Sequence, residues 1–264
     1  MSLRVRAMET RVGLVLLQRG KPVTPTAAGA TVLRLARQLD RLRADAVEEL
    51  TAGDGAASIP LVVNADSLAT WFLPALVRAS RETGAYFEVL RADESESTEL
   101  LRNGTAMAAV TAVREPVPGC TATPLGSVRY RALASPEFVA RHFPDGVSAA
   151  SLRAAPAVEF DRSDHLQDRF VRSITRVPLT PPRHFVPSSA EFATAVSWGL
   201  GWGMLPDAQS LGPRERGELV PLPAGRPIDL PLFWQRWNLE SPALAALSSI
   251  VTEAAAAALL PTKK

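Results

Sequence analysis

Three short polar side chains lie where a strand is expected to run into a helix. The apolar residues Val62 and Val63 lead into Asn64, Asp66 and Ser67, and a helix-like apolar stretch, "LATWFLPAL", follows. A helix N-terminus presents unpaired N–H groups and a partial positive charge, so an anion is stabilised there. Helix capping is the other interpretation of these residues. The junction therefore predicts either a cap or a binding site for a small charged molecule.

A second junction of the same kind occurs later in the chain. Pro187-Ser188-Ser189 follows the extended "HFV" and precedes the helical "EFATAVSWG". In α/β sheets, ligands lie beyond the carboxyl ends of strands. If both junctions face one cleft, a carboxylate fits against the two helix ends. Acidic residues after other strands, in "RADESEST" and "EFDRSDHLQD", suit a cationic group.

Other groups that could do chemistry give weaker patterns. The three histidines lack metal-ligand spacing, and Cys120 is a lone cysteine, expected to be a small buried apolar residue. "GLGWGMLP" reads as a helix stop before a strand, not as a dinucleotide fingerprint. No catalytic set is present, so the sequence predicts neither an enzyme nor a cofactor or metal. The tryptophans expected in the core or a cleft wall are Trp198, Trp202, Trp234 and Trp237.

Length and composition indicate an ordinary globular protein. The chain has 264 residues, 47% of them hydrophobic, which is enough for one or two domains with a real core. No apolar run approaches the ~18 residues that span a bilayer, and "MSLRVRAMET" lacks a secretion signal. We therefore expect a soluble, cytoplasmic protein without a membrane partner.

The positive charge is concentrated at the start of the chain. Residues 1–43 hold nine Lys/Arg and two acids, for a net charge of +7, and the remainder carries −5. This asymmetry is typical of a nucleic-acid-facing end on an acidic body. A solvated, arginine-rich helix face is the equally open alternative.

The first fifth of the chain predicts a helix end, a wing and a long helix. "SLRVRAMETRVG" ends at a glycine stop, and "LVLLQRGKPVTP" reads as a small hairpin with a basic tip. Thr24-Pro25 is expected to open a helix that reaches about Leu50. Its apolar residues follow the 3-4-3 spacing of a coiled coil, which favours pairing with a second copy over packing on its own body. These seam residues are Val32, Leu35, Leu39 and Leu42.

After a small-residue linker at 51–58, strands and helices alternate, which indicates an α/β body. The alternation breaks near 113–128 and 220–229, so we predict two lobes, with the chain crossing near 126 and returning near 228. The last helix is expected from about Pro242 to Leu260. The expected strands are Leu61–Asn64, Phe87–Asp93, Met107–Ala112, Arg129–Ala134, Ala157–Phe160, His184–Val186, Gly203–Leu205 and Leu230–Arg236.

This order of elements resembles the LysR-type transcriptional regulators across residues 2 to 260. "VNADSLATWFLPAL", "AMAAVTAVREPVPGC", "VPSSAEF", "GLGWGMLP" and "LFWQRWNLES" resemble its basic-amino-acid branch, the regulators of lysine and arginine export. The resemblance implies a winged helix-turn-helix, here incomplete, then a dimerising linker helix and a two-lobed effector domain of periplasmic-binding-protein type. It also implies a homotetramer, a lysine or arginine effector, and activation of an exporter gene by binding to its promoter DNA.

The resemblance divides the chain and assigns its sites. Residues 1–24 would form the end of the recognition helix and the wing, and 25–58 the linker helix and hinge. Lobe I would comprise 59–126 plus 229–264, and lobe II would comprise 127–228. The implied DNA contacts are Ser2, Arg4, Arg6, Arg19 and Lys21. The implied effector contacts are Asn64, Asp66, Ser67, Asp93, Thr111, Asp161, Ser188 and Ser189, with the effector carboxylate at the serines and an amino group at Asp66 or Asp93.

Two departures from the family pattern matter. The chain starts inside the third helix of the helix-turn-helix, and Leu3 stands where the family has Gln. Our hypothesis is a misplaced start, which the upstream DNA decides; a chain that truly begins here is expected to lose specific operator binding. In Ser188-Ser189-Ala190-Glu191, the Glu has changed places with its small neighbour. Successive residues on a helix are rotated by ~100°, so Glu191 is not expected to keep a ligand contact made from the family's position.

Two other classes of protein remain open from the sequence. A solute-binding module of the same two-lobed architecture would have no DNA role, and the basic wing and the heptad helix argue against it. An enzyme on a similar scaffold is disfavoured by the missing catalytic set. For a regulator, the favoured mechanism is a population shift, in which the effector stabilises one lobe arrangement.

Overall fold

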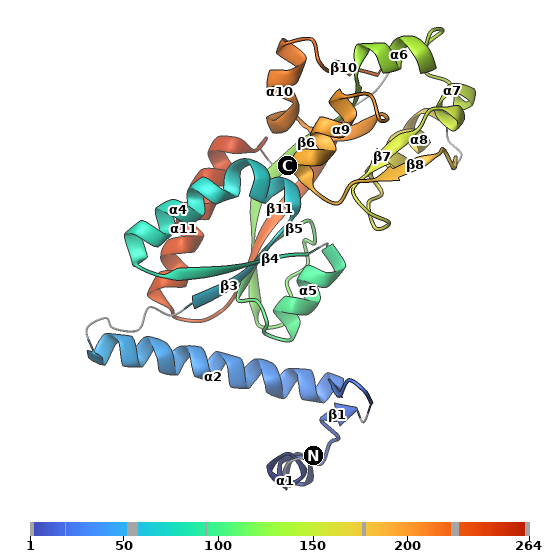
Figure 1. The fold of residues 1–264 in the computed structure, drawn as a ribbon. Coiled ribbons are helices and arrows are strands. Elements are labelled where there is room, and N and C mark those ends of the chain that lie inside the picture. Colours follow the sequence, from blue (N-terminus) through green and yellow to red (C-terminus); the bar gives the residue numbers. More distant parts are fainter. Residues whose placement is uncertain are drawn as a thin grey trace. The chain divides into compact units, whose positions relative to one another are not determined.

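Strands and helices alternate along most of the chain, as the α/β prediction requires (Figure 1). The structure is a computed structural model that describes residues 3–18, 20–51, 58–92, 94–175, 178–222 and 227–261. It forms two units. Unit 1 comprises Met1–Asn64, Pro74–Thr123 and Phe233–Glu253, and unit 2 comprises Ala65–Leu73, Pro124–Leu232 and Ala254–Lys264.

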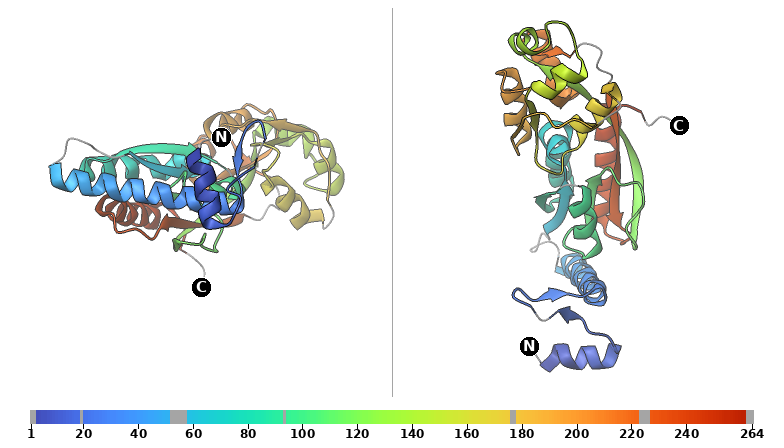
Figure 2. Two further views of the ribbon diagram at one scale, coloured as in Figure 1. Left: turned by 90° about the horizontal axis from the view of Figure 1, so that it is seen from below. Right: turned by 90° about the vertical axis from the view of Figure 1, so that its right-hand side faces the viewer.

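The N-terminal helix end and wing are present in unit 1. Helix α1 (Leu3–Val12) ends at Gly13, whose φ of +72° a glycine adopts without strain. Strands β1 (Leu17–Gln18) and β2 (Thr24–Pro25) pair antiparallel as a hairpin beside the start of the next helix (Figure 2). The helix cap predicted at Thr24-Pro25 is wrong, because these two residues pair with β1. The cap is Thr26, whose Oγ1 accepts a hydrogen bond from Gly29 N at 3.0 Å.

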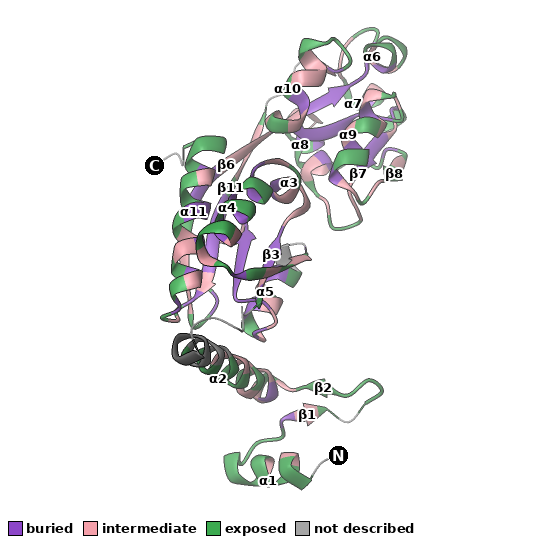
Figure 3. Ribbon diagram, turned by 60° about the vertical axis from the view of Figure 1, so that its left-hand side comes forward, coloured by how far each residue is buried: buried purple, intermediate pink, exposed green. Residues whose placement is uncertain are grey.

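In helix α2 (Ala27–Thr51), most of the residues whose burial is described are exposed or half-buried (Figure 3). Leu35 and Leu39 of the predicted seam are 54% and 57% exposed. Two arginines on the same helix contact the rest of unit 1. Arg34 Nη1 donates to Pro118 O at 2.9 Å, and Arg37 Nη1 donates to Asn103 O at 2.8 Å. The arginine-bearing face therefore packs against the helix's own unit, and the leucine seam stays uncovered in the single chain.

The sheet of unit 1 has the strand order β11-β5-β3-β4. Strand β3 (Ser58–Val63) pairs parallel with β4 (Tyr86–Arg91) and β5 (Ala108–Thr111), and β11 (Ile228–Trp237) pairs antiparallel with β5. Helices α4 (Leu73–Thr83), α5 (Glu94–Arg102) and α11 (Pro242–Ala258) accompany it. One of its apolar clusters joins the strand residues Val62 and Ala109, the helix residue Leu101 and the loop residue Val117.

Unit 2 contains a sheet of β10 (Val220–Pro221), β6 (Cys120–Ala134) and β9 (Gly203–Pro206), and the parallel pair β7 (Ala157–Glu159) and β8 (Arg183–Phe185). Its core cluster includes Tyr130, Phe138, Phe170, Trp202 and Met204. Its helices are α6 (Pro136–His142), α7 (Ala149–Ala154), α8 (Leu166–Thr175), α9 (Ser189–Ser197) and α10 (Asp207–Glu215).

Two further expectations from the sequence are wrong. Residues 120–128 are not a break but the first half of β6, because Gly126 takes a φ of +135° and brings the strand beside the backbone of Leu260. A Cβ on Gly126 would lie 2.7 Å from Leu260 O, so glycine permits this approach. Trp198 is 85% exposed, whereas Trp202, Trp234 and Trp237 are buried as predicted. Trp198 follows directly on the last residue of α9, where its side chain meets solvent.

Candidate ligand-binding site

The polar residues after β3 form the start of a helical run. Helix α3 (Ala65–Ser67) continues into a π-helical turn, η1 (Leu68–Phe72), and then into α4. Thr70 Oγ1 donates to the carbonyl of Asp66 at 2.6 Å. Isolated π turns inside helices are frequent at functional sites, since they widen the helix and change the direction of its side chains. Asp66 is thus placed in the turn directly before this irregularity.

The Asp66 carboxylate is the centre of a hydroxyl cluster within unit 2. Tyr130, on β6, donates its phenol to Asp66 Oδ2 at 2.7 Å. Ser189, the first residue of α9, donates to Asp66 Oδ1 at 2.5 Å and accepts from Gln209 Nε2 at 2.7 Å. Three segments far apart in sequence therefore meet at one carboxylate, and a fourth, which carries Gln209, contacts Ser189. We call Asp66, Tyr130, Ser189 and Gln209 the Asp66 cluster.

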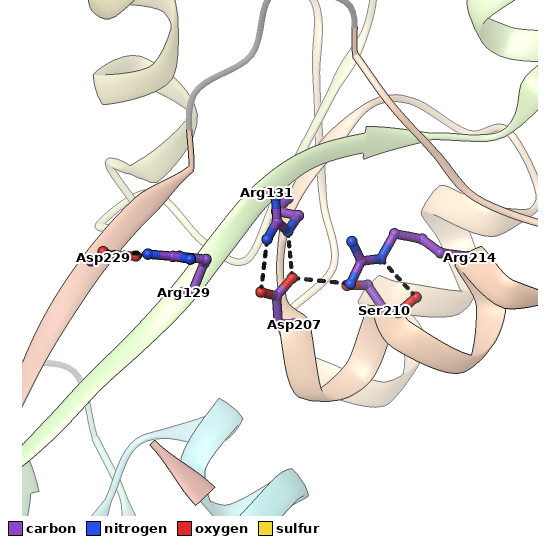
Figure 4. A network of polar contacts seen from close by, with 6 residues as sticks. All are labelled: Arg129, Arg131, Asp207, Ser210, Arg214 and Asp229. Atoms are coloured by element: carbon purple, nitrogen blue, oxygen red, sulfur yellow. Dashed lines mark hydrogen bonds and ion pairs between the residues drawn. The ribbon is translucent and has the colours of Figure 1, made fainter. Parts of the chain in front are cut away.

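Ion pairs fix the helix that supplies Gln209 (Figure 4). Asp207, the first residue of α10, accepts from Arg131 of β6 at 2.6 and 3.2 Å and from Arg214 at 3.1 Å. Arg129, two residues earlier on β6, makes a two-pronged pair with Asp229 at 2.7 and 2.9 Å. An aspartate at a helix N-terminus also interacts favourably with the helix dipole. The contacts of Asp207 hold the start of α10 on β6 and so orient Gln209 toward Ser189, whereas the Arg129–Asp229 pair joins β6 to β11.

Acidic side chains follow β7, as the sequence suggested. Asp161 Oδ1 accepts from the backbone N–H and the hydroxyl of Ser163, at 2.8 and 2.6 Å, so it organises its own turn. Burial raises the pKa of Asp164 above its usual 3.8, against hydrogen bonds from the N–H groups of Leu166 and Phe160, and the charge of Asp66 adds to the rise. Asp164 is therefore a buried carboxylate whose charged form is disfavoured mainly by burial and, to a smaller degree, by the charge of Asp66.

A third acid in this region is already paired. Glu159, on β7, is buried, and burial raises its pKa although Arg183 opposes the shift. Arg183 forms ion pairs with both Glu159 and Asp168. This triad ties β7, β8 and α8 together, so its role is structural.

Ser188 and Glu191 interact with each other at the start of α9. Ser188 is the N-cap residue, and its hydroxyl donates to the carboxylate of Glu191, the third helical residue. That hydrogen bond lowers the pKa of Glu191. The displaced Glu of the sequence motif thus serves the helix start.

The remaining predicted contacts lie at strand ends in unit 1, in α3 and around the N-terminus. Asn64 follows β3, and Thr111 ends β5; because the two strands are parallel, both residues lie at the same edge of the sheet. Thr111 Oγ1 is buried and lies 3.4 Å from Ser97 Oγ. Ser67 is buried in α3. Arg4, Arg6 and Lys21 are exposed. Ser2, Arg19 and Asp93 lie outside the described residues.

Sequence reasoning missed Tyr130 and Gln209. Tyr130 stands in an alternating strand, where a buried aromatic residue ordinarily indicates only core. Gln209 lies on an amphipathic helix with no motif around it. Their partners are 64 and 20 residues away in sequence, and only the fold brings them to Asp66 and Ser189.

In the part of the chain that the structure describes, there is neither a candidate metal site nor a helix that could span a membrane. Within that part, no group of three or more His, Cys, Asp or Glu is arranged to hold a metal ion. Nor is any described helix long and apolar enough to cross a bilayer. Burial raises the pKa of the Cys120 thiol to about 11, so it is protonated at neutral pH.

Comparisons with known proteins agree over nearly the whole chain. The family model for the LysR substrate binding domain matches residues 57–256. The HTH-type transcriptional regulator LysG of Mycobacterium tuberculosis is 41% identical over 256 residues, covering 96% of this chain and 83% of the relative. The crystal structure of ArgP from Mycobacterium tuberculosis matches with a TM-score of 0.91 and 41% identity, covering 98% of this chain and 88% of that one. Full-length LysG from Corynebacterium glutamicum with bound effector arginine matches with a TM-score of 0.86 and 35% identity, over the same shares of the two chains.

Proposed function

Since the chain belongs to the LysR family of transcriptional regulators, we propose that it is a DNA-binding regulator that senses a basic amino acid. The effector is arginine or lysine, and the target is the promoter of an amino-acid exporter gene. The chain is a regulator and not an enzyme, like the relatives that it matches. It acts in the cytoplasm, as a homodimer through α2 and as a homotetramer when assembled.

One observation carries this proposal. The chain matches over 98% of its length a LysG structure that holds arginine as its effector, at 35% identity. Such a match extends beyond the fold of one domain, since it includes α1, the hairpin, α2 and both units. The Asp66 cluster supplies the chemistry, because an anionic carboxylate oriented by hydroxyl donors is a suitable partner for an ammonium or guanidinium group.

The proposed effector site combines the strand-end residues with this cluster. The amino group pairs with Asp66 or Asp93, and the α-carboxylate takes hydrogen bonds from the helix starts at Ser67 and Ser188/Ser189. Asn64, Thr111 and Asp161 complete the lining. Tyr130 and Gln209 join the proposed set because they hold Asp66 and Ser189 in place.

The other proposals concern organisation. Residues 1–24 form the DNA-reading segment, with contacts from Ser2, Arg4, Arg6, Arg19 and Lys21, which reach phosphates or bases. Residues 25–58 form the dimerising helix and hinge. Residues 59–126 plus 229–264, and residues 127–228, form the two effector-binding lobes. Effector binding biases the arrangement of the assembly and thereby its DNA-reading ends.

Calorimetry on the full chain tests this function directly. Titration with lysine, arginine and histidine should show binding of at least one of these amino acids. Asp66→Ala should weaken that binding by about tenfold or more, since a charge-assisted hydrogen bond contributes ~1.5–3 kcal/mol. Asp145→Ala, at an exposed turn position, is the matched control and should bind like the wild type.

Two results would count against the proposal. If none of the three amino acids gives heat, the proposal that a basic amino acid is the effector is wrong. Unchanged affinity in Asp66→Ala, with an intact circular dichroism spectrum, places the partner of the amino group elsewhere.

A further inference from the structure

Helix α5 makes polar contacts within unit 1 near both of its ends. In its first half, Ser97 is buried, and its hydroxyl lies 3.4 Å from Oγ1 of Thr111, the last residue of β5. Thr111 Oγ1 also accepts from Val113 N at 3.2 Å. This end of α5 is therefore packed on the strand end at which we propose that the effector binds.

The other end of α5 contacts the linker helix. Arg37 Nη1, on α2, donates to Asn103 O and to Thr105 Oγ1, each at 2.8 Å. Asn103 follows the last residue of α5, where the helix dipole is negative, so a guanidinium is well placed there. Gly104 allows the close approach, since a Cβ on it would lie 3.1 Å from Arg34 Cα and 2.9 Å from the Trp237 ring.

The end of α5 has little freedom to move independently of its surroundings. Leu101 is fully buried, and its carbonyl accepts from the Trp237 indole at 3.3 Å. Asn103 Oδ1 accepts from Thr105 N at 2.8 Å, which closes the turn that Arg37 contacts. The end of α5 and its contact with Arg37 are therefore tightly packed and hydrogen-bonded.

Arg37 lies on the side of α2 opposite to the leucine seam. If Val32, Leu35, Leu39 and Leu42 occupy the a and d positions of a heptad, Arg37 falls at position f, which faces away from the seam. Leu35 and Leu39 are more than half exposed, whereas Arg37 is half-buried against its own unit. One face of α2 thus joins the effector-binding unit, and the other is available to a second copy of the chain.

We infer that α5 is the mechanical link between the effector site and the linker helix, with Arg37 as the positioning residue at its joint. The inference rests on the proposed function and extends it to the regulation of that site. Effector contacts at the Thr111 end shift α5 along or about its axis. Arg37 passes this shift to α2, and α2 carries it to the partner helix on its leucine seam.

Amide hydrogen exchange on the full chain tests the link, with arginine as the probe. In the wild type, saturating arginine should change exchange in both α5 and residues 27–43 of α2, the latter by roughly fivefold or more, at the low end of usual allosteric couplings. Arg37→Ala should keep the change in α5 and lose the change in α2. Arg37→Lys, which retains the charge and one hydrogen bond, should recover part of it.

Arg43→Ala is the matched control, since Arg43 is an exposed arginine on the same helix, and it should behave as the wild type. The inference is overturned if α2 responds to arginine in Arg37→Ala as it does in the wild type, or if the wild type responds in α5 alone. Calorimetry on the same samples separates this result from failure of the proposed function, in which arginine gives no heat with any variant.

Discussion

The Asp66 carboxylate does not stand alone: both of its oxygens accept hydrogen bonds from hydroxyl groups. A carboxylate has about four acceptor positions, so it can bind a cationic group while it keeps these donors. The donors fix the plane of the carboxylate, and Gln209 fixes Ser189 in turn. The expected benefit is pre-organisation, because less freedom remains to be lost when a ligand binds.

Tyr130→Phe should weaken arginine binding without removing a direct ligand contact. The substitution keeps the buried ring and deletes only the phenol that holds Asp66 Oδ2. What is lost is the pre-organisation of Asp66; ordering one side chain on binding costs ~0.5–1.5 kcal/mol, so a loss of affinity of about two- to tenfold is expected in calorimetry. Tyr86→Phe is the control, because Tyr86 lies 66% exposed on β4. Tighter binding in Tyr130→Phe would show that the phenol competes with the ligand for the carboxylate.

At the scale of elements, the junction between α2 and α5 depends on a glycine. Gly104 has a φ of +79°, and a Cβ there would overlap the Trp237 ring and press on the Arg34 backbone. Gly84 has a similar φ of +68°, with nothing within 4 Å of the same position. Comparing substitutions at the two glycines therefore distinguishes the cost of the backbone conformation, common to both, from the cost of steric overlap at Gly104 alone.

Gly104→Ala should destabilise the protein more than Gly84→Ala does. A left-handed backbone conformation costs a non-glycine residue ~1–2 kcal/mol, so the free energy of unfolding should fall by that amount in both variants. Overpacking adds ~1–3 kcal/mol at Gly104 alone. Urea unfolding of the two variants measures the difference directly. If both variants lose the same free energy of unfolding, α2 moves away from α5 at little cost. The tight contact at Gly104 would then be unimportant for stability.

Local patterns in the sequence were enough to predict many of the elements. The 3-4-3 leucine spacing predicted α2, and the alternation of apolar runs and helices predicted β3, β5, β7 and β9, because period and burial are local properties. The errors occurred where tertiary contacts decide. Thr24 is not the predicted helix cap because it pairs with β1. Gly126 continues a strand because Leu260 lies beside it.

The candidate site was predictable only in part, for the same reason. Asp66 and Ser189 stand at strand-to-helix junctions, which have a local signature in polar residues before an apolar helix. Tyr130 and Gln209 have no such signature, since their function comes from a neighbour that is distant in sequence. The contact between Glu191 and Ser188 was also unexpected, because the exchange with Ala190 placed the Glu within reach of the Ser188 hydroxyl.

At the scale of the whole molecule, α2 is the surface through which we propose that copies of the chain meet. Its apolar seam is exposed in the single chain, and its arginine face is used by unit 1. An uncovered a/d stripe of leucines on a 25-residue helix is typical of a helix that pairs with another. If two copies pair through this seam, the contact between Arg37 and the end of α5 lies on the outer side of the two paired helices.

Leu39→Lys should therefore shift the protein from dimers or tetramers toward monomers. The substitution puts a charge at the centre of the proposed seam, where pairing would have to bury it, and burying an unpaired charge costs several kcal/mol. Asp40→Lys introduces the same residue one position further on, at heptad position b, where it remains solvated. Light scattering after size-exclusion chromatography, over a range of protein concentrations, gives the mass of each variant. Monomers only in Leu39→Lys would support the seam, whereas equal masses for wild type and both variants would place the contact between copies on another surface.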